Sequence, residues 1–302
     1  MTSYQLFVSA PGAVPTQNIP VSMEMIRSVC RQEVSLEPWK EKQNSGCWMA
    51  CAPLSTQTPI TPGVVVQALK ARTTRQQEPC DINLVSSELL DFQPKLFLMD
   101  VDSTMIKQET IDELGKKMGV GEKISSVTEQ AMKGKLNFEA ALLERLVYFI
   151  GLREENFLGV LPSLEPQDGL QDLITWAHQR QMYVACVSGG FNLIVKRLAE
   201  QFGLDGYYAH ELEFNSGRFT GKVVGPVVDG KEKVKYLSQL CRKLSLTPQD
   251  AVVIGDGAND CAMVRKARVG IGFKPKPKLA QEVQLVLHAS SLNAIPLFFE
   301  KW

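Results

Sequence analysis

Short apolar runs alternate with helical patterns over the first ninety or so residues of the chain. Three runs have the composition and length of strands: Tyr4 to Ala10, Cys47 to Pro53 and Cys80 to Ser86. The segments between them, Met23 to Gln32 and Val64 to Arg75, carry apolar residues at helical spacing. The pattern predicts a small α+β domain over residues 1–94, bounded by the turn sequence Asp91 to Pro94.

From Lys95 onward, apolar strand patterns alternate with helical ones, which predicts an α/β domain with a mostly parallel sheet over residues 95–302. Three of the predicted strands run directly into a polar residue: KLFLM into Asp100, MYVACV into Ser188 and DAVVIG into Asp256. Ligands of such sheets bind outside the carboxyl ends of the strands. We therefore expect these three polar residues to share one crevice.

The first and second of these strands are separated by far more residues than one crossover helix requires. Helical periodicity recurs in the intervening sequence, over Glu109 to Gly119, Ser125 to Lys133 and Asn137 to Ile150. This predicts a helical cap inserted at about residues 106–165. Further on, the strand-like halves of His210 to Pro226 flank an Asn-Ser-Gly turn and predict a hairpin beside the core.

Composition narrows the classes of function. The 302 residues are 44% hydrophobic, enough for two domains with a sizeable core. Lys and Arg total 33, as do Asp and Glu, so the net charge is 33 − 33 = 0 and neither nucleic acid nor anionic lipid is an expected partner. The amino-terminal sequence has no signal-peptide pattern and the chain has no apolar run of membrane-spanning length, so we expect a cytoplasmic protein.

The seven cysteines, an odd number, do not resemble a disulfide framework. Cys47 and Cys51 are four residues apart, but no second Cys or His pair at zinc-site spacing accompanies them. Buried, reduced thiols are the expected state.

Two common nucleotide motifs are excluded. GDGAND, residues 255–260, resembles a dinucleotide-binding glycine turn, but Asp260 stands where the third glycine should be. No GxxxxGK[ST] loop occurs.

Four carboxylates are expected in the predicted crevice: Asp100, Asp102, Asp256 and Asp260. Two carboxylates one residue apart repel each other, so their coexistence indicates a hard cation such as Mg²⁺. Ser188 and Gly189 precede the helical sequence FNLIVKRLAEQF, whose free N–H groups suit a phosphate oxygen, and Lys233 would add a positive charge. Together these groups indicate phosphoryl transfer through an aspartyl-phosphate.

These motifs carry a resemblance to a known family. DVDST (Asp100 to Thr104), SGG (Ser188 to Gly190), Lys233 and GDGAND match, in order, the four motifs of the haloacid dehalogenase-like phosphatases. The closer resemblance is to the phosphoserine phosphatase group, through ETIDEL, AMKGKLNFEAALLERL, VSGGFN and IGDGANDCAMV. It covers residues 95 to about 292 and implies a Rossmannoid sheet core with an inserted cap.

The resemblance implies a role for each matching residue. Asp100 corresponds to the nucleophile and Asp102 to the general acid and base, while Asp100, the Val101 carbonyl and Asp256 correspond to Mg²⁺ ligands, with Asp102 and Asp260 also expected at the metal. The residues expected to bind substrate are Ser188, Gly189 and Lys233 for phosphate, Asn259 beside them, Glu109 for the ammonium group, Arg145 for the carboxylate, and Met132 and Phe138 for the apolar side. The implied reaction is hydrolysis of O-phospho-L-serine to L-serine and phosphate, the last step of serine biosynthesis.

The helical spacing of the cap agrees with these roles, because Phe138 and Arg145 are seven residues apart and lie on one helix face. The competing interpretation of Arg145 is a surface ion pair with Glu139 or Glu144.

Four further questions stay open at the level of sequence. A phosphotransferase that uses an acceptor such as homoserine has nearly the same motifs. An amino acid sensor with an idle core would be expected to lack Asp100 or Asp102, and both are present. The N-terminal order of strands and helices is compatible with a regulatory domain of the ACT type, which some longer bacterial relatives carry. A homodimer is also left open.

Overall fold

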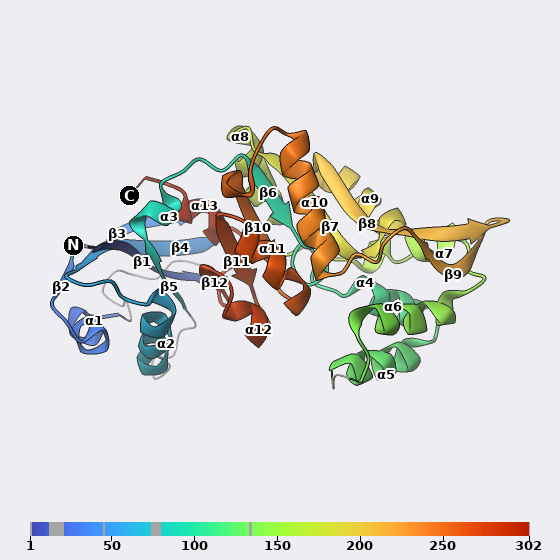
Figure 1. Cartoon of the computed structure of the whole chain (residues 1–302), viewed down its shortest axis with the longest axis horizontal. Helices are drawn as coiled ribbons and strands as arrows, with labels where there is room; N and C mark the ends of the chain where they lie inside the picture. Colours follow the sequence, from blue (N-terminus) through green and yellow to red (C-terminus); the bar gives the residue numbers. More distant parts are fainter. Residues whose placement is uncertain (1, 12–20, 45, 74–79, 133–134, 302) are drawn as a thin grey trace.

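The computed structural model describes residues 2–301 apart from 12–20, 45, 74–79 and 133–134. Two β-sheets lie next to each other along the long axis of the molecule, and a lobe of helices projects from one side (Figure 1). The N-terminal sheet is at one end, and the hairpin of β8 (Gly206–Asn215) and β9 (Arg218–Val224) is at the other.

The N-terminal sheet is antiparallel, in the order β2-β4-β1-β5, with β3 also paired to β4. Its elements are β1 (Thr2–Pro11), α1 (Met23–Cys30), β2 (Val34–Leu36), β3 (Lys40–Asn44), β4 (Cys47–Thr56), α2 (Pro62–Thr73) and β5 (Asp81–Ser86). The three predicted strands and both helices are present, and the end of the second predicted helix, Thr74 and Arg75, lies outside the described residues.

Both faces of this sheet are buried. One face packs on α1 and α2, where Leu6 and Ile82 meet Ile26 and Leu69. The other packs on the second sheet's domain, where the rings of Phe7 and Phe298 lie edge to face with centroids 4.9 Å apart. A sheet covered on both sides needs continuous apolar runs rather than alternation, which explains the sequences of β1, β4 and β5.

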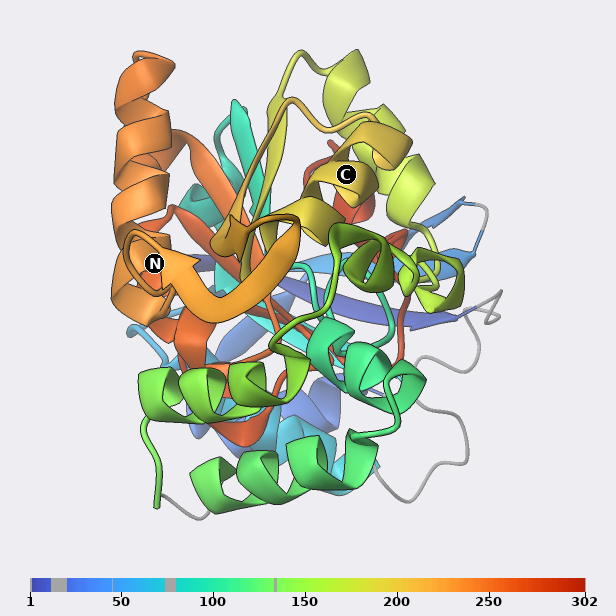
Figure 2. The ribbon, with the colours of Figure 1, turned by 90° about the vertical axis from the view of Figure 1, so that its right-hand side faces the viewer.

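The larger sheet has the order β12-β11-β10-β6-β7-β8-β9 and is parallel except for β9, as predicted for an α/β domain. Its strands are β6 (Leu96–Met99), β7 (Tyr183–Phe191), β8 (Gly206–Asn215), β9 (Arg218–Val224), β10 (Ala251–Gly255), β11 (Val269–Phe273) and β12 (Leu285–Leu287). Figure 2 shows the sheet between two helical layers. These are α8 (Leu170–Gln179) and α9 (Asn192–Phe202) on one side, and α10 (Gly230–Lys243) and α11 (Cys261–Lys266) on the other.

The predicted hairpin is present, but it belongs to the sheet and does not lie beside it. β8 pairs in parallel with β7 and antiparallel with β9, so the hairpin extends the sheet by two strands. Ser216 and Gly217 at its tip have φ angles of 49° and 73°. Two consecutive left-handed residues give the turn that matches the twist of hairpin strands.

The insertion folds as a helical cap. It contains α4 (Thr110–Lys117), α5 (Gly121–Met132), α6 (Phe138–Leu146), η2 (Val147–Phe149), α7 (Glu154–Leu158) and η3 (Leu161–Ser163). The chain enters and leaves the cap side by side, at a bridge between Ile106 and Pro166. Figure 2 shows α4, α5 and α6 below the edge of the sheet.

Two predicted cap boundaries are wrong. α5 begins at Gly121 and not at Ser125, because Gly119, at φ 70°, turns the chain immediately before it. α6 ends at Leu146, and the next turn, Val147–Phe149, is a 3₁₀-helix. The β-branched and aromatic residues of VYF have low helix propensity, which periodicity alone does not register.

The remaining short elements are α3 (Ser87–Leu90), η4 (Pro248–Asp250), η5 (Ala258–Asp260), α12 (Pro277–Ala280) and α13 (Ala294–Phe298). All seven cysteines are free thiols, and five of them are buried, including Cys47 and Cys51. None of the helices in the described residues is both long enough and apolar enough to cross a membrane.

Side chains of β5 join the two sheets. The Asn83 amide donates to the Val286 carbonyl at 3.0 Å and accepts from the Val286 N–H at 2.7 Å. The buried Asp81 carboxylate accepts backbone N–H groups of His288, Ala289 and Ser290 at 2.7 to 3.1 Å. The first sheet is thus fixed to β12 and to the loop that follows it.

Candidate active site

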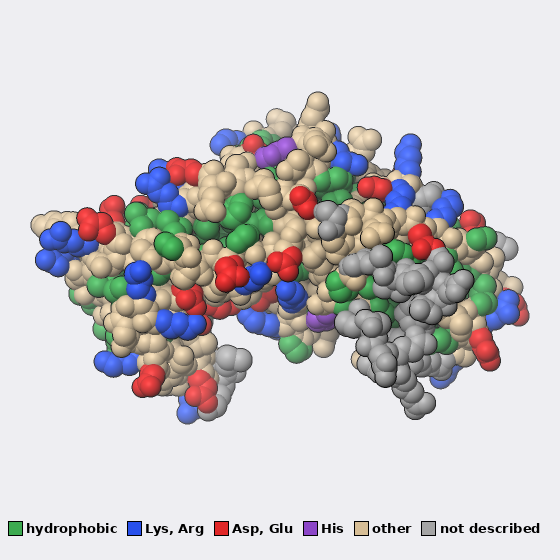
Figure 3. Space-filling view, turned by 180° about the vertical axis from the view of Figure 1, so that it is seen from behind, with side chains coloured by type: hydrophobic (Ala, Val, Ile, Leu, Met, Phe, Trp, Pro, Cys, Tyr) green, Lys and Arg blue, Asp and Glu red, His purple; other side chains and the backbone are tan. Residues whose placement is uncertain are grey.

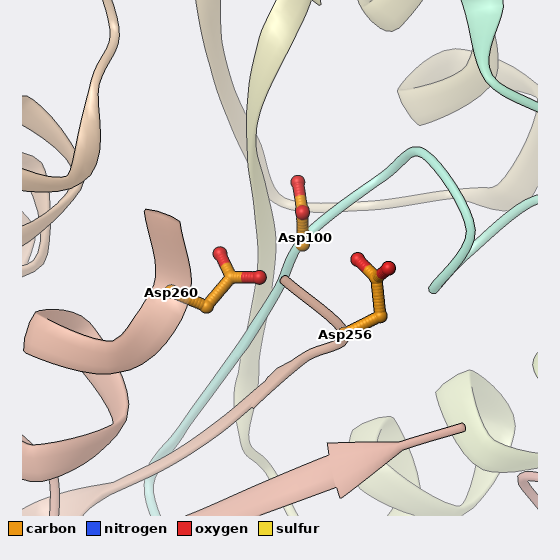
Figure 4. A group of neighbouring side chains, drawn as sticks. All are labelled: Asp100, Asp256 and Asp260. Atoms are coloured by element: carbon orange, nitrogen blue, oxygen red, sulfur yellow. The ribbon is translucent and has the colours of Figure 1, made fainter. Parts of the chain in front are cut away.

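Three buried aspartates converge at the carboxyl ends of β6 and β10. β6 and β10 are paired neighbours, and the Asp100 N–H continues the ladder by donating to the Ile254 carbonyl at 2.9 Å. This places Asp100 beside Asp256, and η5 brings Asp260 to the same point. Carboxylate oxygens of the three residues lie within 4.8 Å of one another (Figure 4). A side chain at Gly255 would collide with the Asp260 carboxylate, so glycine is required there.

Lys233 lies fully buried among these acids. Its Nζ is 2.8 Å from Asp100 Oδ1 and 2.7 Å from Asp260 Oδ1. The lysine projects from the first turn of α10, which Asp229 caps by accepting from the Lys231 and Glu232 N–H groups. Burial opposes the charge on Lys233, but Asp100 and Asp260 outweigh it and raise the pKa of the amine. Lys233 therefore stays an ammonium group inside the site.

The cluster still carries excess negative charge. Burial, and next the carboxylate of Asp260, raise the pKa of Asp100 well above its usual range, although Lys233 opposes the shift. Burial likewise raises the pKa of Asp256. Three buried carboxylates with one ammonium group form an oxygen donor set that suits a hard divalent cation. The residues present thus fit a metal site at this cluster.

Two predicted ligands do not take part in the cluster. The Val101 carbonyl accepts three backbone N–H groups, from Thr104, Met105 and Ile106 at 2.8 to 3.2 Å, and so faces its own loop. The Asp102 carboxylate is not one of the clustered groups, because its Oδ1 accepts from the N–H and hydroxyl of Thr110. The tight turn after Asp100, which sequence motifs do not describe, causes both differences.

Asp102 instead lies between the cap entrance and the Ser188 turn. The Ser188 hydroxyl is 3.4 Å from Asp102 Oδ2. Burial, and then the charge of Glu109, raise the pKa of Asp102 to about 6, against the hydrogen bonds from Thr110. A carboxyl group with this pKa can carry a proton or release it near neutral pH, which is what a general acid and base requires.

The irregular segment Ser188–Gly190 of β7, called the Ser188–Gly190 turn below, is built around a buried hydroxyl. Ser188 Oγ accepts from the Gly190 N–H at 2.8 Å, and the ring of Phe138 from the cap reaches the Cα position of Gly189 so closely that an added Cβ would be 3.1 Å from Cζ. Gly189 therefore allows the cap to approach the core here.

His210 supports this turn, and sequence reasoning missed it. The Val228 N–H donates to its Nε2 at 2.7 Å, so the proton resides on Nδ1, which lies 3.0 and 3.1 Å from the Gly189 and Gly190 carbonyls. Burial lowers the pKa of His210, in line with a neutral ring. The sequence AHELEF on β8 gives no sign of this, because the partners are backbone groups of distant segments.

The predicted substrate-binding residues of the cap lie partly at the site. Glu109, the N-cap residue of α4, accepts from the Ser103 hydroxyl at 3.0 Å. Arg145 is largely buried, and although burial lowers its pKa, the acids that most strongly favour its charge are Asp112, Glu109 and then Asp102. Among the ion pairs of the described residues, none joins Arg145 to Glu139 or Glu144. Met132 ends α5, and its side chain lies outside the described part of the chain.

Asn259 lies in η5, beside α10, the helix that carries Lys233. Its carbonyl is so close to Gly230 that a Cβ there would be 2.9 Å away, and its side chain turns back toward Gly257. Figure 3 shows the molecule notched between the cap and the rest, with acidic and basic side chains along the edge of the notch.

A protein-family model described as haloacid dehalogenase-like hydrolase matches residues 94–268, more than half of the chain. The chain belongs to the haloacid dehalogenase-like hydrolases. The predicted family and its fold class are therefore confirmed.

One protein of known name and two solved structures show which members of the family the chain resembles. A phosphoserine phosphatase of Archaeoglobus fulgidus is 36% identical over 213 residues, which are 70% of this chain and 62% of that protein, so the match spans under two thirds of the relative's length. The solved structure of a phospho-aspartyl intermediate analogue of phosphoserine phosphatase is 34% identical, with a TM-score of 0.64 over 69% of this chain and all of that one. A hydrolase of the same family from Salmonella enterica serovar Typhi has a TM-score of 0.81 over 98% of this chain and 99% of that one, at 21% identity, which shows the fold alone.

Proposed function

We propose that the protein hydrolyses O-phospho-L-serine to L-serine and phosphate through an aspartyl-phosphate on Asp100. The observation that carries the proposal is how the carboxylate of Asp100 is held between Lys233 and the backbone of Val101. Its Oδ1 accepts from the Val101 N–H at 2.7 Å and from Lys233 at 2.8 Å. With Oδ1 engaged twice, Oδ2 is the oxygen left to attack phosphorus.

The proposed reaction has two displacements. Asp100 Oδ2 bonds to phosphorus while the bond to the serine oxygen breaks, and Asp102 donates its proton to that oxygen. Water then attacks the phosphorus, Asp102 takes up one of its protons, and the Asp100–phosphate bond breaks. The pKa of about 6 suits Asp102 to both proton transfers. Lys233, Ser188 and the backbone of Gly189 would hold the phosphate oxygens.

The cofactor proposed for the aspartate cluster is Mg²⁺, held by Asp100 and Asp256, with Asp260 bound to Lys233 beside them. When bound, Mg²⁺ would offset the negative charge of the transferring phosphoryl group. We also propose that Glu109 and Arg145 bind the ammonium and carboxylate groups of the substrate, with Phe138 and Met132 on its apolar side and Asn259 behind Lys233.

Several other expectations remain predictions. They are a cytoplasmic location, a homodimer, a domain boundary near residue 94, and a regulatory, ACT-like role for residues 1–94.

The test of the proposed function is release of inorganic phosphate from O-phospho-L-serine by the purified full chain, with and without Mg²⁺ and with and without added homoserine. We expect Mg²⁺-dependent release that homoserine does not reduce. A fall in free phosphate with a matching rise in phosphohomoserine would identify a phosphotransferase. No release from phosphoserine, with release from other phosphate esters, would overturn the proposed substrate.

A further inference from the structure

A second lysine, Lys276, contacts acids of the site with which Lys233 forms no ion pair. It follows β11 and is the N-cap residue of α12. Its Nζ is 3.0 Å from Asp256 Oδ2 and 3.7 Å from Glu109 Oε1. The backbone N–H of Lys276 donates to the Asp256 carbonyl at 2.8 Å. This hydrogen bond fixes the backbone of Lys276 relative to the aspartate cluster.

The two carboxylates that Lys276 contacts are those proposed to receive other cations. Asp256 is one of the three clustered metal-binding candidates. Glu109 is the acid proposed for the substrate's ammonium group. Lys233 pairs with Asp100 and Asp260, whereas the ion pairs that the described residues form with Asp256 and Glu109 are those of Lys276. Arg145 also acts on Glu109 through its charge, but without an ion pair.

The contact differs in character from the Lys233 contacts. The Lys233 side chain is 0% exposed, whereas that of Lys276 is 59% exposed, and Glu109 is 44% exposed. A buried ammonium group between two carboxylates cannot leave without exposing both. An exposed one on a long flexible side chain can move into solvent at little cost.

We propose that Lys276 pairs with Asp256 and Glu109 in the metal-free protein and is displaced when the divalent metal and the substrate's ammonium group bind. Lys276 thus sets how tightly the site takes up both ligands, and it is a positioning residue and not one that reacts. The inference rests on the proposed function and names a determinant of its metal and amino-group affinity.

The position of Lys276 is in turn connected to the first sheet. Two residues earlier, the Lys274 N–H donates to the Leu287 carbonyl of β12, and Asn83 of β5 holds the neighbouring Val286. The segment that carries Lys276 therefore lies between the active site and the strand on which the N-terminal domain is docked.

The first test is calorimetric titration of Mg²⁺ into the metal-free full chain. The variant is Lys276→Gln. The matched control is Lys278→Gln, which changes an exposed lysine of α12 two residues further along the chain. Because a competing like charge is removed, we expect Lys276→Gln to lower the Kd for Mg²⁺ by at least about threefold. The control should leave the Kd within about 1.5-fold of the parent, since solvent and salt screen it. An unchanged or higher Kd in Lys276→Gln would overturn the proposal.

The second test is made at saturating Mg²⁺, so that it reports on the contact of Lys276 with Glu109 and not on its contact with Asp256. The measurement is the change in KM caused by Lys276→Gln for two esters: phosphoserine and 3-phosphooxypropanoate, the same ester without the amino group. We expect KM for phosphoserine to fall by a factor that is at least about twofold larger than for 3-phosphooxypropanoate. Equal changes for the two esters would overturn competition at Glu109. If the parent protein binds no Mg²⁺ or releases no phosphate, the proposed function fails. If it does both and Lys276→Gln binds Mg²⁺ no more tightly, this inference alone fails.

Discussion

The backbone N–H of Val228 donates to Nε2 of His210 at 2.7 Å, in the buried interior behind the Ser188–Gly190 turn. Because Nε2 accepts, Nδ1 must donate, and the carbonyls it meets belong to Gly189 and Gly190. One neutral ring thereby fixes the segment before α10 to the turn proposed to bind phosphate.

Replacing His210 should weaken phosphate binding more than turnover. In His210→Leu, two carbonyls and one N–H lose their buried partner, so the turn loses its fixed shape. We expect KM for phosphoserine and the inhibition constant of inorganic phosphate to rise about tenfold, with a smaller change in kcat. His210→Asn, which retains one donor and one acceptor, should recover part of the loss. Equal inhibition constants in the parent and His210→Leu would remove His210 from this role.

Asp100→Asn should abolish turnover, because an amide is a poor nucleophile and cannot form the acyl-phosphate. The measurement is phosphate release together with calorimetric binding of phosphoserine, which should persist. Residual activity within about tenfold of the parent, equivalent to roughly 1.4 kcal/mol in the barrier, would show that another residue is the nucleophile.

Arg145→Ala should lose activity on phosphoserine and largely keep it on a phosphate ester without carboxylate or ammonium groups. A charge-assisted contact in a closed site contributes about 1.5 to 3 kcal/mol, so kcat/KM for phosphoserine should fall at least about tenfold. Arg145→Lys should not restore it fully, because a point charge lacks the planar fork.

Glu144→Ala, at the exposed neighbouring position, is the control for α6 and should leave both activities near the parent values. If Arg145→Ala lowers both activities equally, Arg145 supports the fold or the cap. If it changes neither, the carboxylate of the substrate is bound elsewhere.

Asp102 should make the stability of the metal-free protein depend on pH. Its pKa in the folded protein is about 6, above the ordinary value of 3.8. The stability this group contributes is therefore fully present below about pH 4 and is lost as the pH rises through about 6. Asp102→Asn, which stays neutral, should gain in free energy of unfolding over the parent as the pH increases from about 5 to 7. Urea unfolding in the presence of a chelator measures this, and a difference that does not change with pH would refute the raised pKa.

Asp81→Ala should destabilise the whole chain, because it leaves the backbone N–H groups of the loop after β12 without their buried acceptor. We expect the free energy of unfolding to fall by about 3 kcal/mol. Asp91→Ala, at an exposed acid near the boundary, should change it by less than about 0.5 kcal/mol. Thermal or urea unfolding of both variants provides the measurement, and equal effects would show that the Asp81 contacts contribute little.

The sequence predicts the reacting residues well because their chemistry requires charged side chains directly after buried strands. Asp100 and Asp256 directly follow β6 and β10 for that reason, and Lys233 meets Asp100 as the motifs imply. Ser188 was predicted to follow its strand, but it lies inside β7, which continues to Phe191. The orientation of the Val101 carbonyl could not be predicted, since it depends on how the next five residues turn.

His210 and Lys276 were missed for a related reason. Their partners are backbone groups or acids brought close only by the fold, so no local pattern in the sequence marks them. The packing of the N-terminal sheet against the domain of the larger sheet could not be predicted from the sequence either. Apolar runs reveal that both faces of β4 are buried, but they do not reveal what covers each face.

The Asn83 amide gives Val286 the same donor and acceptor that a neighbouring strand would provide. β12 is the last strand of the large sheet, and an uncovered last strand is a template on which another chain can pair and aggregate. The N-terminal domain therefore covers part of this edge: where its contact with β12 opens, an unpaired strand edge and the apolar surface around Phe298 become accessible to other molecules.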